Sequence, residues 1–111
     1  MYLLNWNQEA TNIEVNLGGV ITGGEASVLV SEVLDELASD DFSGWDFVLD
    51  CAFARRIDPE ATLEINRLRD LLNVHEVKFV CVTASEDIAQ QLISQNLQAV
   101  LEGREQYLVA A

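Results

Sequence analysis

The sequence predicts an α/β fold, in which a mostly parallel, mixed sheet of four to five strands is packed against helices. Strand-like and helix-like segments alternate in the order β-β-α-β-α-β-α-(β)-α, and this alternation requires crossover connections between parallel strands. Residues 46–49 and 77–82 are almost continuously apolar, as expected for internal strands covered by helices. Half of the 111 residues are hydrophobic and one is proline, so we expect a single folded domain over residues 1–111.

The first part of the chain predicts two strands and a helix. Residues 13–17 alternate apolar and polar side chains with the period of a half-buried strand, and residues 2–6 form an earlier strand. Glycine pairs at 18–19 and 23–24 allow tight turns before the helix. The helix is expected over residues 25–38, because its apolar side chains recur at spacings of three and four: Ala26, Leu29, Val30, Val33, Leu34 and Leu37.

Asp58 and Pro59 predict the start of a second helix after the strand at residues 46–49 and a short loop. The aspartate carboxylate can accept a hydrogen bond from an unpaired N–H group of the first turn, and proline suits the first helical position. One apolar stripe defines the helix: Ala61, Ile65, Leu68 and Leu72.

The last part of the chain predicts one internal strand, two helices and a short extended segment. The strand covers residues 77–82. Ser85 is expected to cap a third helix, which Asn96 closes. Residues 97–101 are interpreted as a short strand or extended segment, and residues 103–110 as a final helix.

The charge of the chain excludes several classes of partner. A formal charge of −13 argues against nucleic-acid binding, which needs a basic stripe, and against adhesion to anionic lipids. No apolar run approaches the ~20 residues that cross a bilayer, and the first ten residues lack the features of a secretory signal. We therefore expect a cytoplasmic protein without direct membrane insertion. Most positive charges cluster in one region: Arg55, Arg56, Arg67, Arg69 and Lys78.

No set of reactive residues forms a known catalytic or metal-binding motif. Cys51 and Cys81 lack the spacing of a zinc site, and we expect two small buried thiols in a reducing compartment. His75 has no companion ligand and no nucleophile near it in the sequence, and no phosphate-binding glycine loop occurs. We therefore expect no enzymatic activity, metal or cofactor. The aromatic side chains are expected to complete the core or its rim: Trp6, Phe42, Trp45, Phe53 and Tyr107.

The segment over residues 47–60 resembles the central segment of the STAS domain family (sulphate transporter and anti-sigma factor antagonist). An apolar strand ends on Asp50, and Asp58 opens a helix eight positions later. Residues 17–22 resemble the glycine-containing turn that precedes the first helix in this family. Residues 80–85 resemble its last core strand and the loop that follows. The resemblance covers nearly the whole chain and implies the STAS layout of strands and helices.

The regulatory motif of the family is degenerate in this sequence. STAS domains usually follow the second aspartate with Ser/Thr-Ser/Thr-Gly, and the second hydroxyl is the phosphoacceptor. Asp58 matches that aspartate, while Pro59 takes the first hydroxyl position, Glu60 the phosphoacceptor position and Ala61 the glycine position. Glu60 is either a permanent substitute for a phosphorylated residue or simply a favourable acidic residue in a first helical turn. Thr62 offers a displaced hydroxyl as an alternative phosphoacceptor.

The resemblance implies that the loop and helix start around Asp58 form a docking surface for a kinase-like anti-sigma factor or a related regulator. Arg55 and Arg56 adjoin this surface and either contact an acidic partner or remain solvated. The expected function is a non-enzymatic regulatory protein–protein interaction, as in an anti-sigma factor antagonist. The alternatives are an accessory STAS subunit of a membrane lipid-transport ATPase, and a small-molecule or lipid binder with a pocket between sheet and helices.

Overall fold

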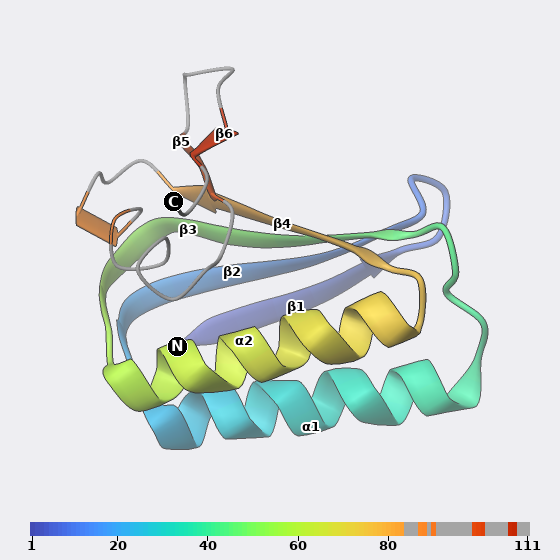
Figure 1. The fold of residues 1–111 in the computed structure, drawn as a ribbon, viewed down its shortest axis with the longest axis horizontal. Helices are drawn as coiled ribbons and strands as arrows, with labels where there is room; N and C mark the ends of the chain where they lie inside the picture. Colours follow the sequence, from blue (N-terminus) through green and yellow to red (C-terminus); the bar gives the residue numbers. More distant parts are fainter. Residues whose placement is uncertain (84–86, 89, 91–98, 102–106, 109–111) are drawn as a thin grey trace.

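A mixed sheet carries both long helices on one of its faces (Figure 1). The computed structural model describes residues 1–83, 87, 88, 90, 99–101 and 107–108. The predicted α/β fold class is confirmed, with these elements in chain order: β1 (Tyr2–Asn7), β2 (Asn12–Ile21), α1 (Gly23–Ser39), β3 (Asp46–Ile57), α2 (Pro59–Val74), β4 (Lys78–Thr83), β5 (Ala99–Leu101) and β6 (Tyr107–Leu108).

The order of the strands across the sheet follows their order in the sequence, from β1 to β6. β2, β3, β4 and β5 pair in parallel, while β1 and β6 pair antiparallel with their neighbours at the two edges. The β2–α1–β3 and β3–α2–β4 connections advance across the sheet in the same direction. Because such crossovers are right-handed, α1 and α2 lie on the same face, with their N-termini at the same end of the sheet (Figure 1).

The hydrophobic core fills the space between the sheet and the two helices. Ile13, Val15 and Leu17 of β2 are buried, while the polar residues between them are half-exposed, as the predicted alternation requires. Phe47 of β3 is fully buried and stacks on Phe79 of β4, with ring centroids 5.7 Å apart. The predicted inner stripes of both helices are confirmed, since nearly all of their members are buried: Ala26, Leu29, Val30, Val33, Leu37, Ala61, Ile65, Leu68 and Leu72.

Several element boundaries differ from the prediction. β2 does not end at Leu17 but continues to Ile21, and neither glycine pair forms the expected turn, because Gly18 and Gly19 lie within β2 and Gly23 and Gly24 within α1. β3 does not end at Asp50 but continues to Ile57, so the expected loop is a strand paired with β2. The pairing includes register shifts beside Gly18 and Gly19, and Gly19 has a φ of 70° that suits glycine. α1 begins at Gly23, two residues before its expected start, because the Thr22 side chain accepts a hydrogen bond from the Glu25 N–H.

The C-terminal predictions have mixed outcomes. Residues 87, 88 and 90 are helical, while the expected cap Ser85 and the expected end Asn96 lie outside the described residues. The strand over residues 97–101 is confirmed at Ala99–Leu101. The final helix over residues 103–110 is wrong at Tyr107–Leu108, which form β6. An aromatic residue suits a strand once β5 offers a pairing edge, and the sheet therefore has six described strands rather than four to five.

Of the helices that the structure describes, none is both long enough and apolar enough to cross a membrane. α1 has 17 residues and α2 has 16, and each presents one buried stripe to the sheet and a mostly polar surface to solvent, with Val28, Leu63 and Val74 as exposed apolar exceptions. This amphipathic pattern is that of helices covering a sheet.

Candidate functional site

The predicted site lies at the end of the sheet where β2 and β3 finish and both helices begin (Figure 1). We refer to residues 55–60, together with the first turn of α1, as the helix-start edge. The two helix N-termini approach closely here, because a Cβ atom on Gly23 would lie 2.6 Å from the Cβ of Glu60. A residue with a side chain at position 23 would therefore push the start of α2 away from α1.

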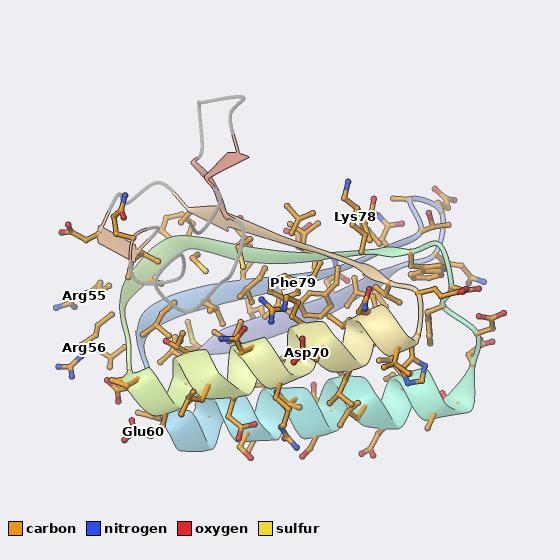
Figure 2. The ribbon with its side chains drawn as sticks, viewed as in Figure 1. Arg55, Arg56, Glu60, Asp70, Lys78 and Phe79 are labelled. Atoms are coloured by element: carbon orange, nitrogen blue, oxygen red, sulfur yellow. The ribbon has the colours of Figure 1, made fainter. Side chains whose placement is uncertain are left out.

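Four of the predicted docking residues are exposed: Arg55, Arg56, Pro59 and Glu60. Figure 2 shows both arginine side chains extending outward from the end of β3, with Glu60 beside them at the first turn of α2. The Arg56 Nε lies 3.1 Å from the Asp58 Oδ1, in an ion pair whose arginine side chain is 69% exposed. Solvent screens such a pair, so we expect it to orient the side chains more than to stabilise the fold.

Asp58 occupies the predicted N-cap position, but its carboxylate makes no capping hydrogen bond. The carboxylate pairs with Arg56 instead, because a charge-assisted contact competes with the neutral N–H groups of the first turn. The Asp58 backbone fixes the start of the helix, since its N–H donates to the Ile21 carbonyl (2.9 Å) and its carbonyl accepts from the Thr62 N–H (3.0 Å). The expected capping role of the Asp58 side chain is therefore wrong, while the expected helix start is confirmed.

Ala61 and Thr62 belong to the inner face of α2 and are 0% and 1% exposed. The Thr62 hydroxyl donates to the Asp58 carbonyl at 3.2 Å. The inclusion of these two residues in an exposed docking surface is therefore wrong, because the helical period turns them toward the core. Thr62 is not accessible as an alternative phosphoacceptor in the folded protein.

Glu60 lies where the positive ends of two helix dipoles meet. Unpaired N–H groups at these ends stabilise a negative charge, and Glu60 supplies one at the start of α2. Glu25 occupies the corresponding first turn of α1, where its carboxylate is 2.6 Å from the terminal ammonium group of Met1. Glu60 thus combines exposure with a position at which a negative charge is electrostatically favourable.

Three exposed apolar residues near the helix-start edge were not predicted as part of the site. Phe53 is 79% exposed, Val20 50% and Leu63 63%. Val20 pairs with Arg56 in the β2–β3 register, and Leu63 follows Glu60 by one helical turn. Leu63 could have been found from the sequence, because it falls outside the apolar stripe of α2. The expectation that Phe53 completes the core or its rim is wrong, since the register shift beside Gly18 reverses the strand face it occupies.

The two cysteines are buried free thiols, as predicted. Burial, assisted by the charge of Asp50, raises the pKa of Cys51 from 9.0 to about 12. Burial also raises the pKa of Cys81. Both thiols therefore stay protonated near neutral pH, and a protonated, enclosed thiol is a poor nucleophile.

Comparisons with known proteins add evidence on the fold alone. The sequence matches no model of a protein family, and no curated protein matches it. Among solved structures, the chain is similar to one described as "Crystal Structure Analysis of Mglu", with a TM-score of 0.58 and 22% sequence identity. The similarity covers 71% of this chain but 18% of that chain, so this protein corresponds to a small part of the larger one.

Proposed function

We propose that this chain is a non-enzymatic, STAS-like module that binds a regulatory protein through its helix-start edge. The observation that carries the proposal is the exposure of Glu60, at the position that matches the phosphoacceptor, together with the exposure of Arg56 and of the apolar Leu63 one helical turn after Glu60. A surface that mixes charged side chains with exposed apolar groups at one edge suits a protein interface. The role that this proposal assigns is that of an anti-sigma factor antagonist without a phosphorylation switch.

The chemistry of the edge indicates what the partner must offer. Arg55 and Arg56 suit an acidic patch, while Phe53 and Leu63 suit an apolar one. A kinase-like anti-sigma factor or a related regulator is the partner class that the STAS resemblance suggests. We place this interaction in the cytoplasm, where a reducing environment keeps Cys51 and Cys81 as the free thiols observed.

Capture of partners from the native cell, with matched variants, tests the proposal. The variant Arg55→Glu/Leu63→Ser changes the helix-start edge at Arg55 and the exposed apolar side chain of Leu63 near it. The control Lys78→Glu/Val74→Ser makes the same kinds of change at the other end of α2 and at the start of β4, where both residues are exposed. We expect the edge variant to lose a regulatory partner that the wild-type and control proteins retain. Retention of that partner by a folded edge variant contradicts the proposal.

The same capture also tests the alternative of an accessory subunit in lipid transport. Recovery of a nucleotide-binding transporter subunit in place of a signalling partner favours the accessory role in lipid transport.

The variants Glu60→Gln and Glu60→Ser test whether the negative charge of Glu60 substitutes for a phosphorylated residue. If Glu60 represents a permanently phosphorylated state, both variants alter partner preference, and the serine variant becomes a kinase substrate. If both variants bind the partner as the wild type does, Glu60 is simply a favourable acidic residue in the first turn of α2 and does not represent a phosphorylated state.

A further inference from the structure

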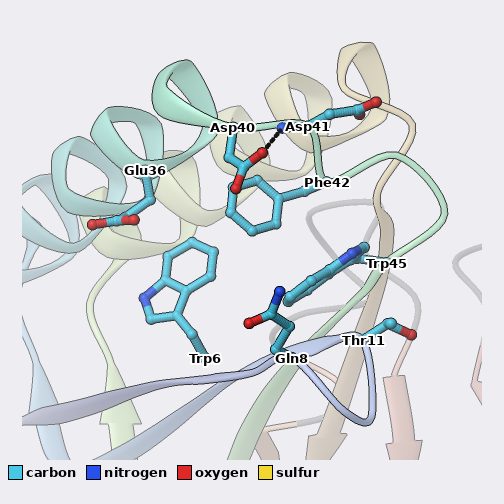
Figure 3. Close-up of a pocket in the computed structure, with 8 residues that line it drawn as sticks. All are labelled: Trp6, Gln8, Thr11, Glu36, Asp40, Asp41, Phe42 and Trp45. Carbon is cyan, nitrogen blue, oxygen red and sulfur yellow. Dashed lines mark hydrogen bonds between the residues drawn. The ribbon is translucent and has the colours of Figure 1, made fainter.

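A cavity of about 520 Å³ lies at the end of the sheet opposite the helix-start edge (Figure 3). This cavity is lined by β1, the turn that follows it, the end of α1 and the loop leading into β3, and it is partly open to solvent. Its volume falls within the range of small-molecule sites, roughly 300–1,000 Å³. Six of its lining residues carry the argument: Trp6, Glu36, Asp40, Asp41, Phe42 and Trp45.

Three aromatic side chains form the apolar walls of the cavity. The ring centroids of Trp6 and Phe42 are 5.1 Å apart with a tilt of 44°, and those of Phe42 and Trp45 are 4.8 Å apart at 89°. The rings pack against the core, as the sequence analysis expects, yet each remains half-buried. At these distances the rings contact one another directly, so a ligand does not fit between them and meets only the ring surfaces that stay open to the cavity.

Acidic side chains form the rim of the same cavity. Figure 3 shows the Asp40 carboxylate accepting a hydrogen bond from the Asp41 N–H (2.8 Å), with Glu36 above Trp6. No Lys, Arg or His occurs among the described residues that line the cavity. Hydrogen bonds from Ser43 lower the pKa of Asp41, which keeps that carboxyl group ionised at neutral pH. The cavity therefore combines ring faces with negative charge, and both attract cations.

The geometry points to a binding site for a small organic cation with a quaternary ammonium group, of which choline is the simplest probe. Such a group has no N–H to satisfy, so its methyl groups can rest on the ring faces while Glu36 and Asp40 balance its charge. A metal ion fits less well, because the described residues contain no group of three His, Cys, Asp or Glu able to hold one. This inference is independent of the function proposed for the helix-start edge.

Tryptophan fluorescence tests the inference directly, because the two tryptophans of the chain, Trp6 and Trp45, both line the cavity. Titration with choline and with tetramethylammonium should give a saturable change in emission. The uncharged analogue 3,3-dimethylbutan-1-ol has the same shape as choline and should bind at least about tenfold more weakly. Equal binding of the uncharged analogue, or no saturable response to choline, overturns the inference. Tighter binding of methylguanidine or a lysine amide also overturns the assignment to a quaternary ammonium.

Two sets of variants locate the binding. Trp6→Leu keeps an apolar side chain but removes a ring face, and we expect affinity for choline to fall about tenfold, with Trp45 still reporting. Glu36→Gln/Asp40→Asn removes rim charge without altering the core and should weaken binding at least as much. Glu32→Gln/Asp35→Asn is the matched control, since it also removes two charges from α1 and both residues are exposed but do not line the cavity. If the rim variant binds choline as tightly as this control does, the cavity is not the site, even should Trp6→Leu fail to fold.

Discussion

The close approach of the two helix starts makes Gly23→Ala a sensitive test of the fold. A Cβ atom at position 23 would lie 2.6 Å from the Glu60 Cβ, whereas ordinary contacts begin at 3.4 Å. The helices must therefore separate by nearly 1 Å, and overpacking of this kind costs about 1–3 kcal/mol. Alanine also has less conformational freedom than glycine in the unfolded chain, which stabilises the folded state by about 0.5 kcal/mol. We expect a net destabilisation of about 0.5–2.5 kcal/mol, which lowers Tm by roughly 2–11 °C.

Urea unfolding of two adjacent glycine variants measures this effect. Gly24 is the matched control, because a Cβ there would meet no atom within 4 Å, and Gly24→Ala should be neutral or slightly stabilising. Glu60→Gly removes the opposing Cβ, so the double variant with Gly23→Ala should recover part of the loss in a double-mutant cycle. If Gly23→Ala proves as stable as Gly24→Ala, the described contact between the helix starts is incorrect.

Three further outcomes are expected. Phe47→Ala removes a fully buried ring stacked on Phe79 and should cost about 3–5 kcal/mol in urea unfolding; a loss below 1 kcal/mol contradicts its core position. Thr62→Val keeps the buried shape but loses the bond to the Asp58 carbonyl, so thermal unfolding should show a loss of about 1 kcal/mol, whereas an unchanged Tm argues against that bond. The free energy of unfolding should fall as pH rises from about 9 to about 12, because Cys51 ionises in the unfolded chain before it ionises in the folded one. Replacing both cysteines with alanine should flatten this part of the pH profile.

The sequence predicted the elements that are defined by their own local residues, without contacts to distant parts of the chain. The start of α2 at Pro59 and its buried stripe at Ile65 and Leu68 follow from local residues alone. The extension of β3 to Ile57 could not be predicted in this way, because it depends on pairing with β2 across register shifts beside Gly18. The strand at Tyr107–Leu108 likewise depends on β5, which offers it a partner.

The same distinction applies to the candidate sites. The exposure of Pro59 and Glu60 follows from the helical period, which also places Thr62 inside. The Asp58 carboxylate could either cap the helix or pair with Arg56, and in the structure it pairs with Arg56. Which contact forms depends on the position of the Arg56 guanidinium group, which the sequence does not specify. The aromatic cavity was missed because Trp6, Phe42 and Trp45 come from β1 and a separate loop, with no spacing that links them.

The sequential strand order has a consequence for synthesis on the ribosome. Each described strand from β2 onward pairs with the one translated before it, so none of the described strands has to insert between two earlier ones. The N-terminal hairpin can form first, and each crossover then adds one strand to a growing edge while the chain emerges at roughly 5–20 residues per second. Assembly can thus proceed in one direction along the polypeptide, without waiting for its last residues.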